Sequence, residues 1–473
     1  MKFEPYDYQK YAVEKIISTP YIALWLDMGL GKTVITLTAI LDLLFNRFLI
    51  SRILIVAPKK VAENTWQAEI QKWDHTRDTL RYSTVLGTQK QRIKALHTPA
   101  SVYIINRENI PWLVEYYKNS WPFDMVVLDE ASSFKNPQAK RFKALKCVRT
   151  RISRIVELTG TPSPNGFIDL WAQIFLLDGG TRLGRNITAY RERWFTPDKR
   201  NREQIFSYKV RKGADVEIKS ILADICISMK AEDYITLPEL INVDVPIRLD
   251  ISARKAYDTI ERTMLLNVDE TTIEAVSAGA LYGKLLQLCN GALYSEAPQF
   301  VEIHSCKLSA LVETVEALNG EHAVIFYSFQ HDAIRIKKAL EPLKLKIVKY
   351  EDKRQEADWN AGKIDILLAH PASVAYGLNL QQGGHHCIWY GVNASLELTL
   401  QANKRLHRQG QTQPVIIHRL YIEDSVEVEA IESLKDKTHA ENALLNSVRA
   451  RVEKIKSQRP SDTADRKENH NEE

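Results

Sequence analysis

Residues 22–33 read IALWLDMGLGKT. A short apolar run ends in a turn that contains Gly29 and Gly31, and Lys32 and Thr33 then open a segment with helical character. Glycine lets the backbone approach phosphate oxygens and point successive N–H groups at them. The N-terminus of the following helix adds partial positive charge. The stretch therefore predicts a phosphate-binding loop, in which Lys32 reaches the β- and γ-phosphates and the Thr33 hydroxyl ligates Mg²⁺.

The loop departs from the strict phosphate-loop pattern at one position. The pattern G-x-x-x-x-G-K-[ST] has glycine where this chain has Leu26. A Gly-rich turn without function is therefore the alternative interpretation. The apolar run before the turn and the helical segment after it favour the phosphate loop.

An acidic pair follows a second apolar run. Residues 125–130 read MVVLDE, so that Asp129 and Glu130 come at the carboxyl end of an expected strand. In α/β sheets, ligands bind at that edge. Asp129 is placed to hold Mg²⁺, and Glu130 can orient and deprotonate an attacking water. Downstream of a phosphate loop, the pair is typical of a Walker B element.

Two zones of the chain alternate β-rich runs with helical stretches. Runs of about four to six aliphatic residues are typical of parallel strands buried on both faces, and the helices between them supply crossovers. We therefore predict two α/β lobes, at residues 1–180 and 301–435. The expected strands are Ile53–Ala57, Val102–Ile105, Met125–Leu128 and Ile155–Leu158, then Ala323–Tyr327, Lys346–Lys349, Asp365–Ala369, His386–Tyr390 and Val415–Leu420.

The remaining segments differ from these lobes in composition and in hydrophobic pattern. Residues 181–300 begin with dense Lys and Arg and continue with the amphipathic stretches Ser252–Leu266 and Ile273–Leu288. They are predicted to form a basic helical insertion and linker. Residues 436–473 are predicted to form a C-terminal helix and a disordered tail, because the end of the chain has almost no apolar side chains to bury.

Composition excludes several classes of protein. A chain of 473 residues exceeds one domain of roughly 100–200 residues, and 45% hydrophobic and 26% charged residues exclude collagenous and disordered chains. A net charge of +5 indicates no particular partner. The 5 cysteines form no C-x-x-C pair, so neither a disulfide framework nor a structural zinc site is expected. No signal peptide and no apolar run near ~18 residues occur, which predicts a reduced, cytoplasmic protein.

Seven segments occur in a fixed order. They are DMGLGKT (27–33), LIVAPKKVAENTWQAEIQKW (54–73), LDEASSFKN (128–136), LTGTPSPNGFIDLW (158–171), VIFYSFQ (324–330), LLAHPASVAYGLNLQQGG (367–384) and QANKRLHRQGQ (401–411). Together they resemble the SWI/SNF-type branch of the superfamily-two helicases, and its minimal phage and bacterial forms, over residues 3–435. The resemblance implies two RecA-like parallel-sheet lobes, with ATP between them and duplex nucleic acid tracked across both.

The resemblance also implies roles for individual residues. Gln9 in the segment PYDYQ would read adenine, and Gln401 leads a sixth motif. In that motif Arg405 and Arg408 would reach the γ-phosphate only when the lobes close, so hydrolysis would depend on closure. Residues implied to couple the ATP site to nucleic acid, or to contact its backbone, are Lys59, Lys60, Thr159, Gly160, Thr161, Gly377, Asn379 and Gln381.

These features predict an ATP- and Mg²⁺-dependent ATPase that is stimulated by nucleic acid and translocates on it. Double-stranded DNA is the expected track, bound through its phosphate backbone, in the cytoplasm of a bacterial or phage-infected cell. The alternatives are an ATP-dependent clamp or assembly factor without processive movement, and a strand-separating helicase. The sequence departs from the family at Ser132, where a histidine or aspartate is usual, and at Lys404, where an acidic residue is common.

Two basic runs leave their role open. One, from Lys135 to Arg154, contains no acidic residue, and a phosphate-binding surface and a solvated helix face are equally consistent with it. The other, from Arg182 to Arg202, is interleaved with Tyr190 and Trp194, for which helix packing is favoured over base stacking.

Two further pairs of side chains are assigned to structure. Trp66 and Trp73 share a helical face and are expected in the core. His385 and His386 follow two glycines, and the sequence near them offers no further metal ligand. We therefore expect a turn and the start of a strand at these histidines.

Overall fold

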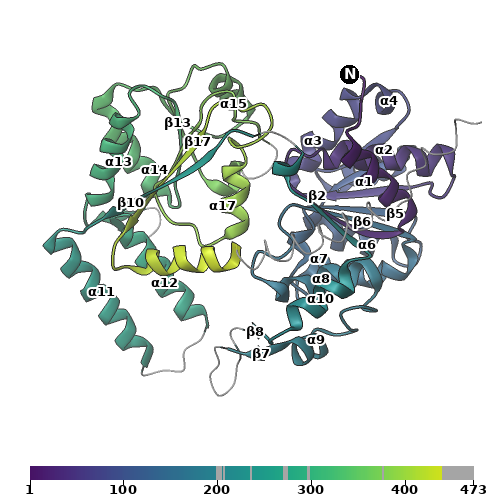
Figure 1. The fold of residues 1–473 in the computed structure, drawn as a ribbon, viewed down its shortest axis with the longest axis horizontal. Coiled ribbons are helices and arrows are strands. Elements are labelled where there is room, and N and C mark those ends of the chain that lie inside the picture. Colours follow the sequence, from purple (N-terminus) through teal and green to yellow (C-terminus); the bar gives the residue numbers. More distant parts are fainter. Residues whose placement is uncertain are drawn as a thin grey trace, which may run out of the picture. The chain divides into compact units, whose positions relative to one another are not determined.

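The computed structural model describes residues 1–198, 205, 208–234, 237–269, 275–295, 299–374 and 378–438, and the side chains of 262–281 lie outside this description. The described chain divides into two compact units, Met1–Asp233 and Tyr234–Thr438 (Figure 1). Each unit is built on its own parallel sheet. The predicted α/β class with two parallel-sheet lobes is therefore confirmed.

The first unit contains a seven-stranded sheet in the order β3-β4-β2-β5-β6-β1-β9. All neighbouring strands in it pair in parallel. The elements are α1 Asp7–Ser18, β1 Tyr21–Leu26, α2 Lys32–Leu41, β2 Ile53–Ala57, α3 Lys59–Lys72, α4 Asp74–Arg77, β3 Tyr82–Val85, α5 Gln89–His97, β4 Val102–Asn106, α6 Ile110–Tyr117, β5 Met125–Asp129, α7 Lys140–Val148, β6 Arg154–Thr159, α8 Leu170–Asp178, α9 Ile187–Trp194, β7 Phe195–Pro197, β8 Tyr208–Val210, α10 Ala214–Leu222 and β9 Cys226–Met229.

The central strands of this sheet are buried on both faces, as their unbroken aliphatic runs predict. One face packs on α6, α7 and α8 through a cluster that joins Leu54, Val126 and Ile155 to Leu113 and Phe142. In Figure 1 the helices α1, α2 and α3 lie over the other face. This arrangement leaves the carboxyl ends of the strands to carry the loops.

The second unit contains a six-stranded sheet in the order β10-β17-β16-β13-β15-β14, and its pairs are also all parallel. One face packs on α12, α13 and α14, and the other on α15 and α17. The elements are β10 Leu240–Ile247, α11 Ile251–Asp269, α12 Ala275–Cys289, β11 Ala292–Tyr294, β12 Phe300–Glu302, α13 Cys306–Ala317, β13 Ala323–Phe326, α14 Gln330–Leu340, β14 Ile347–Lys349, α15 Lys353–Asn360, β15 Ile366–Ala369, α16 Pro371–Val374, β16 His386–Trp389, α17 Leu396–Asn403 and β17 Val415–Ile422.

All nine expected strands are present, and the main difference concerns residues 181–300. The structure does not set this segment apart as a helical insertion, because its beginning and end join different units. Strand β9 extends the first sheet beside β1, and β10 pairs with the whole of β17. Expected boundaries at 180 and 300 thus differ from the observed division after Asp233.

Two further expectations concern the chain end and membranes. A helix occupies residues 426–438, and the expected tail lies outside the described residues. Among the described helices, none is both long enough and apolar enough to cross a membrane.

Candidate functional site

The predicted phosphate loop connects β1 to α2. Gly29 (φ 88°) and Gly31 (φ 82°) both lie in the left-handed region that favours glycine. The Lys32 ammonium donates back across the loop to the carbonyl oxygens of Leu26 (2.7 Å) and Asp27 (3.4 Å). The structure therefore holds a positive charge over the loop at the N-terminus of α2, as phosphate binding requires.

Gln9 packs directly against this loop. Its Nε2 donates to the carbonyl of Leu30 (3.2 Å), and its Oε1 accepts from the backbone N–H of Tyr6 (3.1 Å). A Cβ on Gly31 would meet Gln9 Nε2 at 2.7 Å, so a side chain there would displace the amide. Each end of a carboxamide has capacity for a second hydrogen bond. Gln9 can therefore bind the phosphate loop and, at the same time, form hydrogen bonds with the edge of a nucleotide base.

Three strand ends bring the predicted residues to one edge of the first sheet. Strand β6 lies between β5 and β1, and all three run in parallel. The acidic pair ends β5, the segment Thr159–Thr161 ends β6, and the phosphate loop follows β1. The segment implied to couple the site to nucleic acid thus lies between the two halves of the nucleotide site.

Asp129 is held by a residue that the sequence assigned only to the core. The indole Nε1 of the fully buried Trp66 donates to Asp129 Oδ2 across 2.8 Å. Burial raises the pKa of Asp129, while the Trp66 hydrogen bond and the positive charge of Lys32 act to lower it. Trp66 therefore favours the ionised carboxylate, the form that ligates a metal ion.

Glu130 lies in a left-handed backbone conformation, with φ 57° and ψ 59°. Such a conformation is strained for a residue other than glycine, and it recurs at functional sites. The Glu130 Oε1 accepts from the Thr159 hydroxyl (3.1 Å), and the buried Ser132 hydroxyl lies 3.4 Å from the same oxygen. Ser132, the departure from the family pattern, therefore contacts the acidic pair itself.

Gly160 brings the same segment against the phosphate loop. A Cβ at this position would lie 3.3 Å from the carbonyl oxygen of Leu26 and 3.9 Å from Lys32 Nζ. The close approach explains why glycine stands here. The end of β6 thus contacts Glu130 through the Thr159 hydroxyl, and Gly160 after it lies against the loop.

The phosphate loop is also anchored by β9, which sequence reasoning missed. The Asp27 N–H donates to the carbonyl of Met229 (3.0 Å), and its carboxylate accepts from the N–H of Ala231 (3.2 Å). The run CISM contains one aliphatic residue, Ile227, so it lacks the aliphatic run from which the other buried strands are predicted.

In the second unit, Arg405 and Arg408 converge on one backbone group. The NH1 atoms of both guanidinium groups lie 3.2 Å from the carbonyl oxygen of Leu378. Gln401 is 1% exposed, and its amide makes no hydrogen bond with any described residue. A buried amide without a partner is costly, which marks Gln401 as a candidate ligand-binding group.

The fifth-motif residues next to these arginines are partly described. Gly377 lies outside the described residues, and the exposed Asn379 is fixed through its backbone to Glu356 and Asn360. The backbone carbonyl oxygen of Gln381 accepts a hydrogen bond from Gln411 Nε2. These contacts position the loop without occupying the Asn379 side chain.

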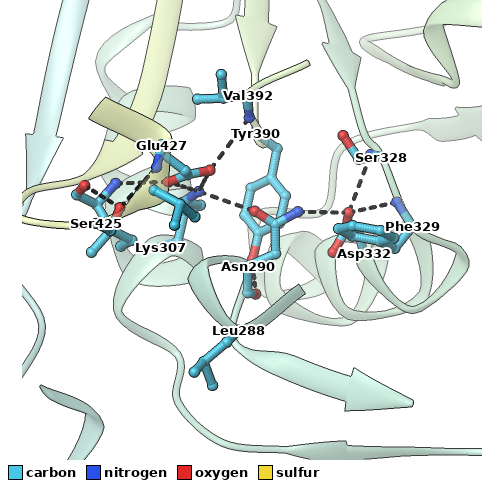
Figure 2. A network of polar contacts seen from close by, with 12 residues as sticks. Leu288, Asn290, Lys307, Ser328, Phe329, Asp332, Tyr390, Val392, Ser425 and Glu427 are labelled. Atoms are coloured by element: carbon cyan, nitrogen blue, oxygen red, sulfur yellow. Dashed lines mark hydrogen bonds and ion pairs between the residues drawn. The ribbon is translucent and has the colours of Figure 1, made fainter. Parts of the chain in front are cut away.

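A buried polar network supports the second unit, and no sequence pattern indicates it (Figure 2). Lys307 and Glu427 are both 0% exposed and form an ion pair of 2.6 Å. Lys307 also donates to Asn290 Oδ1 (3.0 Å), and Asn290 Nδ2 donates to Asp332 Oδ2 (2.9 Å). Asp332 accepts from the backbone N–H groups of Ser328 and Phe329, which follow β13. The network thus joins segments that are far apart in sequence at the carboxyl ends of the strands.

The two basic runs divide between structural and exposed side chains. Arg149 and Arg154 are buried and donate to backbone carbonyls, whereas Lys140, Lys143 and Lys146 are exposed on α7. In the second run, Tyr190 and Trp194 belong to the hydrophobic core, which confirms helix packing. The lysines implied to track nucleic acid, Lys59 and Lys60, are exposed at the start of α3.

The first unit is thus a parallel α/β domain with a phosphate loop and an acidic pair at one sheet edge, the architecture of a P-loop nucleotide-binding protein. The chain matches the family model of the SNF2-related domain over residues 23–289. A phage protein, "Putative protein p41" of Acyrthosiphon pisum secondary endosymbiont phage 1, is 34% identical over 94% of this chain and 99% of that protein. The chain belongs to the SNF2-related family of helicase-like ATPases, and it is an ATPase.

More distant relatives are larger than this chain. The ATP-dependent DNA helicase DDM1 of Arabidopsis thaliana is 24% identical over 93% of this chain, which spans 61% of that protein. The uncharacterized ATP-dependent helicase MG018 of Mycoplasma genitalium is 25% identical over 85% of this chain and 38% of its own length. A solved structure, the Sulfolobus solfataricus SWI2/SNF2 ATPase core in complex with dsDNA, has 22% identity and a TM-score of 0.45, covering 94% of this chain and 95% of that one.

Proposed function

We propose that this ATPase is stimulated by nucleic acid and translocates on double-stranded DNA. The observation that carries the proposal is the position of Thr159–Thr161, which contacts Glu130 through a hydroxyl and the phosphate loop through Gly160. A segment that touches both halves of the nucleotide site can transmit a change at the γ-phosphate to the surface beyond it. The name of the Arabidopsis relative, a DNA helicase, favours DNA as the track.

Within this proposal, ATP binds at the phosphate loop of the first unit. The loop N–H groups and Lys32 bind the phosphates, Gln9 reads adenine, and Glu130 orients and deprotonates the attacking water. Arg405 and Arg408 supply positive charge to the γ-phosphate in the closed state, and Gln401 supports them. Hydrolysis then requires both units.

Mg²⁺ fits the residues at the sheet edge. Asp129 offers a carboxylate, and the Thr33 hydroxyl makes no hydrogen bond with any described residue. Hard oxygen donors of this kind suit Mg²⁺, which would neutralise charge on the phosphates when bound. Trp66 keeps the Asp129 carboxylate oriented for that role.

The track would be held by exposed lysines. Lys59 and Lys60 at the start of α3 and the α7 stripe of Lys140, Lys143 and Lys146 carry charges that can bind phosphates with release of counterions. Contacts of this kind carry no sequence information. Asn379 and Gly377 are proposed to sense the track in the second unit.

The test compares ATPase rates of the full chain with no nucleic acid, duplex DNA, single-stranded DNA and RNA. We expect duplex DNA to stimulate most, Lys32→Ala to abolish turnover, and Glu130→Gln to bind ATP without hydrolysing it. Unchanged rates in all four conditions would contradict the proposal. Displacement of the third strand of a triplex then separates translocation from a clamp, which would hydrolyse ATP yet leave the triplex intact.

A further inference from the structure

Three side chains that can ligate a metal meet at the amino-terminal edge of the second sheet. Glu321 precedes β13, His385 precedes β16, and His386 is the first residue of β16. One donor atom from each lies within 4.8 Å of the others, and His385 Nδ1 is 3.8 Å from Glu321 Oε2. Because the strands are parallel, this edge is opposite to the one that carries the network of Figure 2. The cluster is therefore separate from the Lys307–Glu427 network.

We propose that Glu321, His385 and His386 bind a divalent first-row transition-metal ion such as Zn²⁺. Two imidazoles and one carboxylate are a ligand set that Zn²⁺ accepts with a fourth position left for solvent, and imidazole also suits copper and nickel. Donors about 2.1 Å from a tetrahedral ion lie about 3.4 Å from one another. The observed spacing of Glu321 and His385 reaches this value with small side-chain rotations.

His418 supports one of the ligands. Its Nε2 lies 3.2 Å from Nδ1 of His386, and the two rings stack with centroids 5.5 Å apart. Both residues belong to paired strands, β16 and β17, so their backbones are fixed. A metal-binding histidine is commonly oriented by a second polar group at its other ring nitrogen, and we assign His418 to this positioning role.

The loop that carries His385 is rigid. A Cβ on Gly384 would lie 2.9 Å from both the carbonyl oxygen of His322 and the Trp359 ring, so the loop packs too closely for a side chain. Gln411 Nε2 fixes the same loop by donating to the carbonyls of Gln381 (3.0 Å) and Gly384 (3.1 Å). Rigid support of this kind keeps ligands near their binding positions.

A cavity gives solvent and ions access to the cluster. It has a volume of about 560 Å³ and is lined by Glu321 and His385 together with residues of the loop before β17. Glu321 is more than half exposed, whereas His386 is buried. The fourth coordination position would open toward this cavity.

The experiment uses the full chain without an affinity tag, treated with a chelator and then titrated with Zn²⁺ by calorimetry and with Co²⁺ by visible absorption. We expect one ion per chain and a cobalt spectrum typical of low coordination number. Glu321→Gln and His385→Gln should each weaken affinity by at least about 10-fold, and His418→Gln by about the same factor. Replacing the exposed His97 of the first unit with glutamine is the matched control and should leave affinity unchanged.

Two outcomes would overturn the proposal. The first is the absence of saturable Zn²⁺ binding by the wild-type chain. The second is binding that Glu321→Gln and His385→Gln leave intact, which would place the ion elsewhere. Glu321 is exposed enough for its substitution to leave the fold unchanged, and circular dichroism of each variant checks this. ATPase activity is not needed as a readout, so failure here is distinct from failure of the proposed function.

Discussion

The hydroxyl of Thr159 donates to Oε1 of Glu130 across 3.1 Å and accepts from the N–H of Thr161 across 3.0 Å. The proposed catalytic base is therefore tied by two hydrogen bonds to the backbone that leaves the nucleotide site. A base held in this way is oriented even though its own backbone lies in a strained conformation. A displacement of Thr159–Thr161 would disturb the hydrogen bond to Glu130, and under the proposed function this is the route by which bound nucleic acid would act on hydrolysis.

Thr159→Val tests this route, because valine keeps the shape of threonine and removes the hydroxyl. We expect the nucleic-acid-stimulated kcat to fall by up to about 100-fold, because a small misplacement of a catalytic group can cost that much rate. The KM for ATP should change little, because the phosphate loop is untouched. Steady-state ATPase assays measure both parameters. Thr159→Ser is the control and should retain activity, because serine keeps the hydroxyl. Equal activity of the serine and valine variants would show that the hydroxyl is not used.

Trp66→Phe tests the second contact to the acidic pair. Phenylalanine fills most of the buried volume but cannot donate to Asp129, so the pKa of Asp129 should rise further. Mg²⁺ would then compete with a proton, and the Mg²⁺ concentration for half-maximal ATPase should increase by about 10-fold. Trp73→Phe is the matched control, because the Trp73 indole donates to Glu69 instead. A Mg²⁺ requirement that both variants leave unchanged would contradict the assignment.

The elements that carry the candidate nucleotide site could be predicted from the sequence because its residues are local. Gly29, Gly31 and Lys32 lie within one turn, and Asp129 ends an aliphatic run that is typical of a buried strand. Nine strands were expected for the same reason, since each contains a short, mostly apolar run. Strand β10 was missed because it is largely exposed, and β9 because Ile227 is the one aliphatic residue in its four positions.

Contacts between distant segments could not be predicted. Trp66 reads as a core residue, and nothing near it in the sequence indicates that its indole meets Asp129. The proposed metal site at His385 and His386 likewise could not be predicted, because its other residues are distant in sequence. Glu321 precedes β13, and His418 lies in β17. Local patterns specify elements and caps, whereas the pairing of polar groups depends on sheet order, which a single sequence does not reveal.

A buried glutamate makes the stability of the first unit depend on pH. Glu157 in β6 is 1% exposed, and its carboxyl oxygens make no hydrogen bond with described residues. Burial, and then the negative charge of Asp178, raise its pKa well above the usual value, and Arg149 opposes them only in part. The folded state therefore holds a proton that the unfolded chain releases near pH 4.5. The stabilisation that this proton provides is complete below that pH and is lost as pH rises toward the folded pKa.

Glu157→Gln should remove this dependence. The variant and the wild type should be closest in stability near pH 4.5, and the variant should gain up to about 1.4 kcal/mol per pH unit above it until the folded pKa is passed. Urea unfolding at a series of pH values from 5 to about 8 measures the difference. Asp178→Asn is a useful companion, because it removes the charge that adds to the effect of burial. A constant difference across the series would show that Glu157 is ionised in the folded protein.

The Lys307–Glu427 pair provides the last prediction, on the second unit. Both charges are fully buried, so Lys307→Met leaves the Glu427 carboxylate without its cation and should cost about 3–5 kcal/mol. Adding Glu427→Gln removes the orphaned charge while keeping an oxygen that accepts from the N–H of Ile422 (2.8 Å). The double variant should therefore be more stable than Lys307→Met alone, and the coupling in a double-mutant cycle should exceed about 1 kcal/mol.

Thermal and urea unfolding of the wild type, the two single variants and the double variant measure this coupling. Arg248→Met, which removes an exposed partner of Glu423, is the control for loss of a surface pair. Additive effects would mean that the two charges are stabilised independently by their hydrogen bonds to Asn290 and the backbone, and that the network does not act as one unit.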